Sequence, residues 1–214
     1  MADLAFLHTA AVHVATFSAL LDELAPSLRA VHLVRDDLLA EAQVLGTDDP
    51  ALVTRVRAAL TEADARVVVC TCSTLGGIAE ATDTGGAFQV TRIDRAMADR
   101  AVRAGGTVLL VATVQSTLAP TAALLQSSAQ RLGTSISIAP VLVAEAWPHF
   151  QAGRQAEYIE RIVAAVRCAP RRPTVVLAQA SMAPAAAVLA THGIEALTSP
   201  RLGVEHAIAL CTAQ

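Results

Sequence analysis

The sequence contains no lysine and no asparagine, so all 16 of its Lys and Arg positions are arginines. Without lysine, the chain cannot form a pyridoxal Schiff base and has neither a Walker-type phosphate-binding lysine nor a lysine general base. Aromatic residues make up only 3% of the chain, and its formal net charge is −3. Both features argue against a basic nucleic-acid surface or a base-stacking platform. We therefore expect no nucleic-acid partner.

Cysteine is also scarce. The chain has four cysteines, Cys70, Cys72, Cys168 and Cys211, in 214 residues. Four are too few for a disulfide scaffold of this size, and their spacing matches no zinc-binding pattern. A chain of this length can bury a core without such help. The cysteines are therefore candidates for packing or for thiol chemistry.

Long hydrophobic stretches are present, but they are not typical of membrane spans. Ala104–Gln130 and Pro173–Ile194 carry no formal charge and are long enough to cross a bilayer. Each contains Pro, Gln and several Ser or Thr residues, which favour a buried strand followed by an alanine-rich helix. We expect no signal peptide, because Met1 leads into an apolar run without a basic segment. The prediction is a soluble, cytoplasmic protein without a membrane partner, and its apolar composition is compatible with a homodimer.

Short apolar runs alternate with longer segments of helical period. The predicted strands are Leu4–Leu7, Ala30–Val34, Arg66–Cys70, Phe88–Ile93, Thr107–Ala112, Ser135–Leu142 and Thr174–Ala178. The predicted helices are Val14–Ala25, Pro50–Ala63, Arg95–Ala104, Ala119–Leu132, Gln155–Arg167 and Arg201–Thr212. Continuous Val, Ile and Leu runs between helices are typical of parallel strands that are covered on both faces.

The second half of the chain repeats the order of the first. Thr9 and Thr113 each close a first strand, 104 positions apart, and Cys72 and Gln179 each follow a third strand, 107 positions apart. This offset predicts an α/β fold of two pseudo-symmetric Rossmann-like lobes, each a short parallel sheet flanked by helices. We place the N-terminal lobe at residues 1–103 and the C-terminal lobe at 104–197. Residues 198–214 are predicted to form a segment and helix that return to the N-terminal lobe.

Small polar residues follow the predicted strands. In parallel sheets, ligands bind beyond the carboxyl ends of strands, where backbone N–H groups and helix N-termini are exposed. Hydroxyl and N–H groups of this kind suit a carboxylate, although helix capping alone would also explain many Ser and Thr residues there. Dinucleotide and P-loop motifs are absent. The clusters are His8-Thr9, Cys72-Ser73-Thr74, Thr113 with Ser116-Thr117, Gln179-Ala180-Ser181 and Thr198-Ser199.

Cys72 is the strongest single candidate for chemistry. It lies between a buried strand and a glycine-bearing turn, where N–H groups and a helix dipole favour the thiolate. The alternative is a buried structural thiol. Among the histidines, His8 at a strand end is the best candidate to line a site, whereas Asp94 and Glu145 could serve either a site or a helix cap.

Several of these motifs resemble those of the aspartate/glutamate/hydantoin racemase superfamily. The similar segments are Val67-Val68-Val69-Cys70-Thr71-Cys72-Ser73-Thr74, Ile93-Asp94 with Met97-Ala98, and Val111-Ala112-Thr113-Val114-Gln115-Ser116-Thr117. The opening Leu7-His8-Thr9 resembles racemase-like members of the same superfamily. The resemblance implies two lobes with a small carboxylate substrate between them, and cysteine chemistry without metal or cofactor. It implies catalytic positions at Cys72 and Gln179, and substrate-binding positions at His8, Thr9, Ser73, Thr74, Thr113, Ser116, Thr117, Ala180 and Ser181.

Three departures from the family pattern affect the predicted chemistry. Gln179 stands where the family places its second cysteine, and glutamine has no usable pKa for proton transfer near neutral pH. His8 replaces an acidic residue, and Ser73 replaces the asparagine that follows the first cysteine. Cys70 belongs to the same lobe as Cys72, so it does not replace a base on the opposite face of the substrate.

Three functions fit these residues. The first is a cofactor-independent racemase or isomerase that acts on a small, amino-acid-like carboxylate by proton transfer or thiolate attack. The second is a lyase, above all a decarboxylase, that uses the single thiol of Cys72. The third is a carboxylate-binding protein without catalysis.

Overall fold

The computed structural model describes residues 1–169 and 174–213. They form two compact units, which are Met1–Asp94 together with the chain from Pro200 onward, and Arg95–Ser199. The first boundary follows Asp94, whereas the sequence analysis placed it after residue 103. The reason is that the helix α5 (Arg95–Ala104) packs against α6 (Gln115–Leu132) and against strands of the second sheet.

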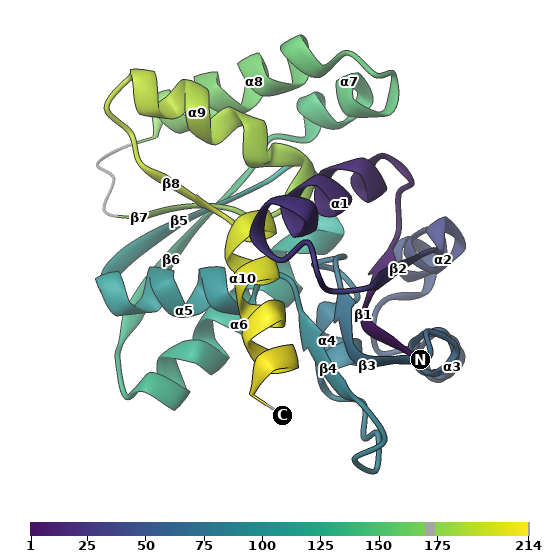
Figure 1. Cartoon of the computed structure of the whole chain (residues 1–214). Helices are drawn as coiled ribbons and strands as arrows, with labels where there is room; N and C mark the ends of the chain where they lie inside the picture. The colour runs from purple at the N-terminus through teal and green to yellow at the C-terminus, as the bar shows by residue number, and fades with distance from the viewer. Residues whose placement is uncertain (170–173, 214) are drawn as a thin grey trace. The chain divides into compact units, whose positions relative to one another are not determined.

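The first unit contains a parallel four-stranded sheet with the order β2-β1-β3-β4. Its strands are β1 (Ala2–His8), β2 (Ala30–Val34), β3 (Ala65–Cys70) and β4 (Gln89–Arg92). Its helices are α1 (Val12–Leu24), α2 (Asp36–Leu45), α3 (Pro50–Glu62), α4 (Gly76–Glu80) and α10 (Ser199–Thr212), the last of which begins at the unit boundary (Figure 1).

Side chains of β1 alternate between two cores. Ala5 and Leu7 pack in a cluster with residues of α2, α3 and α4, whereas Phe6 packs against Phe17 of α1 with tilted rings whose centroids are 5.3 Å apart. Because successive side chains of a strand point to opposite faces, His8 lies on the Phe6 side. The sheet is thus covered on both faces, as the continuous apolar runs predicted.

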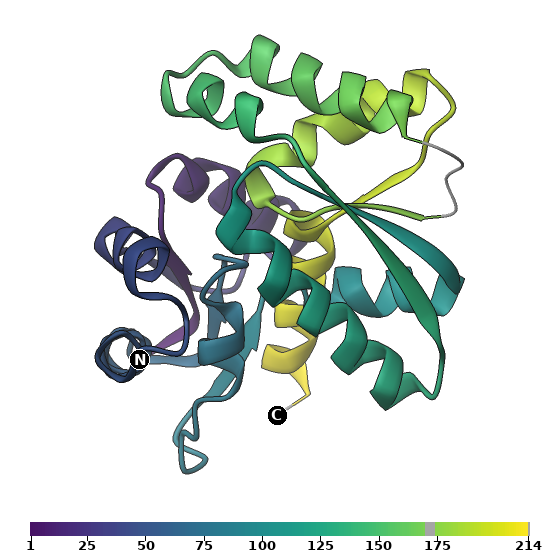
Figure 2. The same ribbon diagram turned by 180° about the vertical axis from the view of Figure 1, so that it is seen from behind.

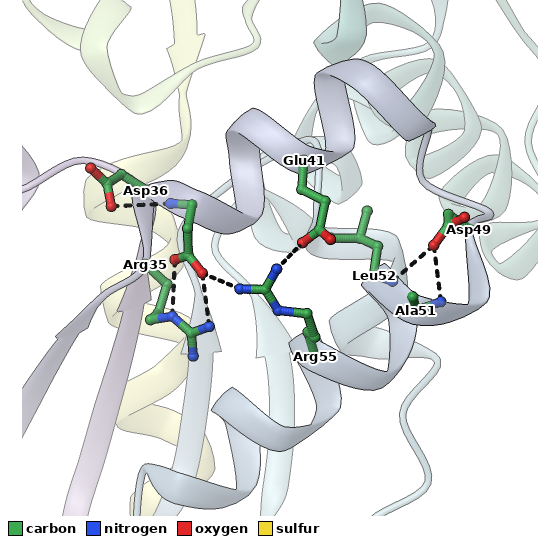
Figure 3. A network of polar contacts seen from close by, with 8 residues as sticks. Arg35, Asp36, Glu41, Asp49, Ala51, Leu52 and Arg55 are labelled. Carbon is green, nitrogen blue, oxygen red and sulfur yellow. Dashed lines mark hydrogen bonds and ion pairs between the residues drawn. The ribbon is translucent and has the colours of Figure 1, made fainter.

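A charged network joins α2 to α3 on the surface of the first unit (Figure 3). The Arg55 guanidinium donates to Asp37 and Glu41, and Asp37 also accepts from Arg35. The α3 helix begins at Pro50 because Asp49 accepts hydrogen bonds from the two N–H groups at Ala51 and Leu52. The sequence analysis did not predict α2, whose short acidic and apolar pattern has no capping signal.

The second unit repeats the topology of the first, with a parallel sheet in the order β6-β5-β7-β8. Its strands are β5 (Gly106–Ala112), β6 (Ile136–Leu142), β7 (Thr174–Leu177) and β8 (Ala196–Thr198). Besides α5 and α6, its helical segments are η1 (Ala144–Ala146), α7 (Trp147–Gln151), α8 (Gln155–Cys168), η2 (Ala180–Met182) and α9 (Ala183–Thr191). Within this unit, α8 and α9 cover one face of the sheet, and α5 and α6 cover the other (Figures 1 and 2).

The predicted α/β fold of two Rossmann-like lobes is confirmed by these two sheets of equal strand order. The uncharged stretches form buried strands followed by helices, although Pro173 lies outside the described residues. The helix α6 begins at Gln115, four residues before the predicted start, and continues through Pro120. Pro120 leaves the Ser116 carbonyl without its helical partner, a cost that the long helix tolerates. None of the helices in the described part of the chain is long and apolar enough to span a bilayer.

Candidate active site

The first unit brings Thr9 and Cys72 together. Thr9 follows β1 and Cys72 lies two residues beyond β3, and these two strands are hydrogen-bonded neighbours in the sheet. The Cys72 sulfur accepts hydrogen bonds from the Thr9 hydroxyl and from the backbone N–H groups of Leu75 and Thr74. The turn after β3 therefore wraps its N–H groups around the sulfur, as the sequence analysis expected for this position.

The environment of Cys72 differs from the expected one in its electrostatics. Only 8% of the residue is exposed, and this burial raises the pKa of the Cys72 thiol. The three hydrogen bonds oppose that effect, and the nearby Asp94 carboxylate adds to it. The N–H groups that were expected to stabilise the thiolate are present, but desolvation outweighs them because the sulfur lies almost inside the core. The group is therefore a thiol at neutral pH.

Cys70 is a core residue. It is fully buried at the end of β3, where burial raises the pKa of its thiol strongly, and its Sγ donates to the Cys72 carbonyl oxygen at 3.6 Å. The interaction shapes the turn before Cys72.

His8 lies inside the core of the first unit. It is completely buried, and burial together with the nearby His32 and His13 lowers the pKa of its imidazole to about 3. Its Nδ1 lies 2.9 Å from the Thr71 hydroxyl and its Nε2 lies 2.8 Å from His32 Nδ1. A substrate group could bind His8 only by replacing one of these partners.

The two acidic candidates have separate surroundings. Asp94 is fully buried and accepts two hydrogen bonds from Arg92, with Nε to Oδ1 at 2.6 Å and Nη2 to Oδ2 at 3.0 Å. Arg92 also donates from Nη2 to the Ser73 carbonyl oxygen at 3.2 Å. Glu145 is exposed in η1. The sequence analysis did not select Arg92, because an arginine at the end of a strand carries no distinct pattern.

In the second unit, Gln179 occupies the position that corresponds to Cys72, two residues beyond β7. Its side-chain Oε1 accepts from the Thr113 backbone N–H at 2.6 Å and from the Thr113 hydroxyl at 2.9 Å. A backbone N–H can only donate, so the atom that faces it must be the amide oxygen. The amide NH₂ of Gln179 therefore points away from Thr113.

Tyr158 supports this cluster from α8. Its hydroxyl lies 2.8 Å from the Ser181 hydroxyl and 3.3 Å from that of Thr113. Burial raises the pKa of the Tyr158 phenol, and the hydrogen bonds with Ser181 and Thr113 oppose that effect. Sequence reasoning missed Tyr158, whose only signal is that it is the sole tyrosine of the chain.

The remaining predicted positions lie at the carboxyl ends of their own sheets. Ser73 and Thr74 are buried in the turn after β3, and Thr117 is buried in the first turn of α6. The Ser116 hydroxyl is buried and has no hydrogen-bond partner among the described residues. Ala180 begins η2, directly after Gln179, and is partly buried. Thr198 ends β8 and is partly buried, and Ser199 is fully buried.

Metal ligands are not grouped in the chain as far as the structure describes it. Within residues 1–169 and 174–213, no three His, Cys, Asp or Glu side chains lie together in an arrangement that could hold a metal ion.

Comparison with known proteins supports the fold. No family model and no curated protein matches the sequence. The structure is similar to that of glutamate racemase from Thermus thermophilus, with a TM-score of 0.70 and 19% identity over 99% of this chain and 81% of that chain. Aspartate racemase from Picrophilus torridus gives a TM-score of 0.70 and 12% identity over 99% of this chain and 93% of that chain. A liganded variant of arylmalonate decarboxylase gives a TM-score of 0.58 and 16% identity over 99% of this chain and 93% of that chain.

The chain therefore has the fold of the aspartate/glutamate/hydantoin racemase superfamily. This confirms, at the level of the fold, the resemblance that the sequence motifs indicated.

Proposed function

We propose that this chain is an enzyme of the racemase superfamily that transfers a proton to or from the α-carbon of a small carboxylate through the thiol of Cys72. The observation that carries the proposal is the hydrogen-bonded sulfur at the carboxyl end of β3, in a fold shared with racemases and a decarboxylase. Parallel α/β sheets bind their ligands at this edge.

Neutral donors would bind the carboxylate. The hydroxyl and backbone N–H groups of Thr9, Ser73 and Thr74 lie around the sulfur or in its turn. Arg92, whose guanidinium bonds the Ser73 carbonyl oxygen, is already paired with Asp94. Preorganised donors of this kind stabilise the negative charge that develops when an α-proton leaves or when a carbanion forms.

The chemistry differs from two-thiol racemisation because Gln179 cannot exchange a proton near neutral pH. With its oxygen held by Thr113, the Gln179 amide offers only N–H donors to a ligand. We therefore propose that the Gln179 amide, which Thr113 orients, binds an anionic oxygen together with Ser181, and that proton transfer belongs to Cys72 alone.

One thiol permits two reactions. In the isomerase class, the Cys72 thiolate takes the α-proton and the resulting enediolate recovers a proton from the same sulfur. A single base returns the proton to the face from which it came, so the thiol alone catalyses α-hydrogen exchange with retention of configuration, which is the first half of a racemisation. In the lyase class, the bond between the α-carbon and a second carboxylate breaks, carbon dioxide leaves, and the thiol proton goes to the α-carbon. The raised pKa of Cys72 favours the second role, because it keeps the thiol protonated and ready to donate.

Deuterium exchange tests the proposal. The protein is incubated in deuterated water with a panel of amino acids, hydroxy acids and substituted malonates, and proton NMR follows the α-position. Loss of the α-proton signal supports α-proton transfer, and chiral chromatography then separates exchange with retention by one base from racemisation. Release of carbon dioxide with one α-deuterium per product supports the lyase reaction. Thermal stabilisation by a carboxylate without either signal would show a binding protein and would refute the enzymatic proposal.

A further inference from the structure

A buried ion pair lies next to the turn that carries Cys72. Arg92 ends β4 and Asp94 follows two residues later, and the two side chains are 3% and 0% exposed. Two parallel hydrogen bonds join the guanidinium to the carboxylate, at 2.6 and 3.0 Å. This fork geometry fixes the plane of the guanidinium.

The same guanidinium contacts the turn at two points. Its Nη2 donates to the Ser73 carbonyl oxygen at 3.2 Å, and the group lies against the backbone of Gly76. A Cβ atom at Gly76 would lie 2.7 Å from Arg92 Nε and 2.9 Å from Cζ, so only glycine leaves room for this contact. Between these two contact points lie Thr74 and Leu75, whose N–H groups donate to the Cys72 sulfur.

Stability alone does not explain the pair. Removing two charges from water costs free energy that their attraction often fails to repay, and an apolar pair of similar volume is commonly as stable. A planar guanidinium that bonds a carboxylate and a carbonyl at once, however, fixes geometry in a way that an apolar pair cannot. The geometry therefore indicates that the pair restrains the turn.

We propose that Arg92, held in place by Asp94, is a positioning residue that aims the N–H groups of Thr74 and Leu75 at the Cys72 sulfur. The inference deepens the proposed function, and it rests on that function only in taking Cys72 as the reactive group. It assigns Gly76 a matching role, because glycine at this position lets the guanidinium approach the turn.

Other groups near the sulfur define what the test must separate. Within the described part of the first unit, Cys70 on β3 and Asp94 after β4 interact with the Cys72 thiol, and Arg92 at the end of β4 pairs with Asp94. His8 on β1 contacts Thr71, next to Cys72, and is neutral in the core. The charges of Arg92 and Asp94 oppose each other at the sulfur. An effect of Arg92 through hydrogen-bond geometry should therefore persist when its positive charge is kept.

A pair of adjacent glycine substitutions provides the first test. Gly76→Ala pushes the guanidinium from the turn, whereas a Cβ at Gly77 meets nothing closer than Arg92 Nη1 at 3.8 Å, so Gly77→Ala is the matched control. Alkylation of Cys72 by iodoacetamide is measured against pH, with peptide mass spectrometry to resolve Cys72 from the other thiols. The pH midpoint reports the thiolate pKa, and the plateau rate reports access. No substrate is needed, so this readout is independent of turnover.

We expect the pH midpoint of alkylation in Gly76→Ala to lie about one pH unit above that of the parent protein. This shift corresponds to a thiolate fraction of Cys72 that is about tenfold lower at any pH below both midpoints. Lost N–H donors destabilise the thiolate, which raises the pKa. Gly77→Ala should keep the parent midpoint. Arg92→Lys keeps the charge without the fork and should shift the midpoint in the same direction, as should the apolar double variant Arg92→Met/Asp94→Leu, which leaves no unpaired buried charge.

An unchanged midpoint in folded Arg92→Lys or Gly76→Ala would overturn the positioning role, as would an equal shift in Gly77→Ala. Circular dichroism verifies that each variant folds. Gly76→Ala, Arg92→Lys and Arg92→Met/Asp94→Leu each disturb the contact between Arg92 and the turn in a different way, so the test still decides if one of them fails to fold. If Cys72→Ala retained turnover, the proposed function would fail while the alkylation result still decided the role of Arg92.

Discussion

In the first unit, the buried His8 stacks on the half-buried His32 with ring centroids 5.1 Å apart, and a hydrogen bond of 2.8 Å joins His8 Nε2 to His32 Nδ1. The direction of this bond follows from its neighbours. The Thr71 hydroxyl donates to the Leu7 carbonyl oxygen at 3.1 Å, so it accepts from His8 Nδ1. Neutral His8 then accepts at Nε2.

The hydrogen-bond chain continues in one direction through His32. With Nδ1 donating to His8, neutral His32 accepts at Nε2 from the Ser18 hydroxyl, at 3.1 Å. A proton added to Nε2 of His8 would place two N–H donors opposite each other, at His8 Nε2 and His32 Nδ1, beside a completely buried imidazole. The hydrogen bonds of His8 therefore require its imidazole to be neutral.

This arrangement predicts acid sensitivity. The pKa of His8 is about 3 in the folded protein and about 6.5 in the unfolded chain, so the unfolded state binds the extra proton between these values. Stability from His8 is then complete above pH 6.5 and falls as the pH decreases, by about 2 kcal/mol between pH 7 and pH 5. Urea unfolding at several pH values measures this loss.

The variant His8→Asn isolates the contribution, because the asparagine amide can still donate to Thr71 and does not titrate. We expect the pH slope of its unfolding free energy to be smaller than that of the parent protein over this range. Parallel slopes for the two proteins would show that His8 does not titrate on unfolding.

The Cys72→Ala variant tests the reactive thiol. Since proton transfer by a positioned group contributes about 10²–10⁴-fold to a rate, we expect turnover to fall by that factor. The fold should persist, because the alanine removes one sulfur atom from an edge of the core. Cys168→Ala is the control, since Cys168 is an exposed thiol at the end of α8. Steady-state rates on the substrate found by deuterium exchange provide the measurement, and full activity of Cys72→Ala would refute the assignment.

The strands and their carboxyl-end residues could be predicted from the sequence, because a parallel sheet with two covered faces needs continuous apolar runs. The continuous run of Val67, Val68 and Val69 predicts β3 in this way, and Cys72 follows two residues after the strand. The pairing of Arg92 with Asp94 could not be predicted, since it depends on the register that sets Arg92 opposite Cys70.

Tyr158 and His32 were missed for a related reason. Both lie on segments whose sequence pattern is that of ordinary packing, and their polar atoms meet partners 14 or more positions away. Burial was equally hidden from the sequence. The N–H donors around Cys72 follow from the turn, but the desolvation that outweighs them depends on how α2, α3 and α4 cover the sheet.

Gln179→Glu tests whether the Gln179 amide binds an anionic oxygen. The glutamate keeps an oxygen for the two Thr113 donors but loses the NH₂ group and gains a negative charge. Loss of a hydrogen bond to a charged group costs about 1.5–3 kcal/mol, so we expect the Kd of a bound carboxylate to rise about 10–100-fold. Calorimetric titration measures the change. Gln130→Glu, an equal change of charge at an exposed position of α6, should leave Kd unaltered, and equal effects of the two substitutions would contradict specific binding by Gln179.

The packing of α10 on the first unit rests on Gly203. A Cβ at this position would lie 2.1 Å from the Ile93 carbonyl oxygen and 2.4 Å from Ile93 Cδ1. The carbonyl belongs to the backbone and cannot rotate away, so the helix itself must move. We expect Gly203→Ala to destabilise the protein by about 1–3 kcal/mol, the usual cost of overpacking a core.

Gly77→Ala is the matched comparison, because Gly77 is also a glycine in a helix of the first unit, but a Cβ there makes only an ordinary van der Waals contact with Arg92 Nη1 at 3.8 Å. Alanine favours helices over glycine by up to about 1 kcal/mol, so this variant should be as stable as the parent protein or more stable. Urea unfolding followed by far-ultraviolet circular dichroism gives both values. Opposite signs for the two alanine substitutions would establish that α10 is fixed against Ile93 by close backbone packing. A Gly203→Ala protein as stable as the parent would instead mean that α10 can shift at no cost.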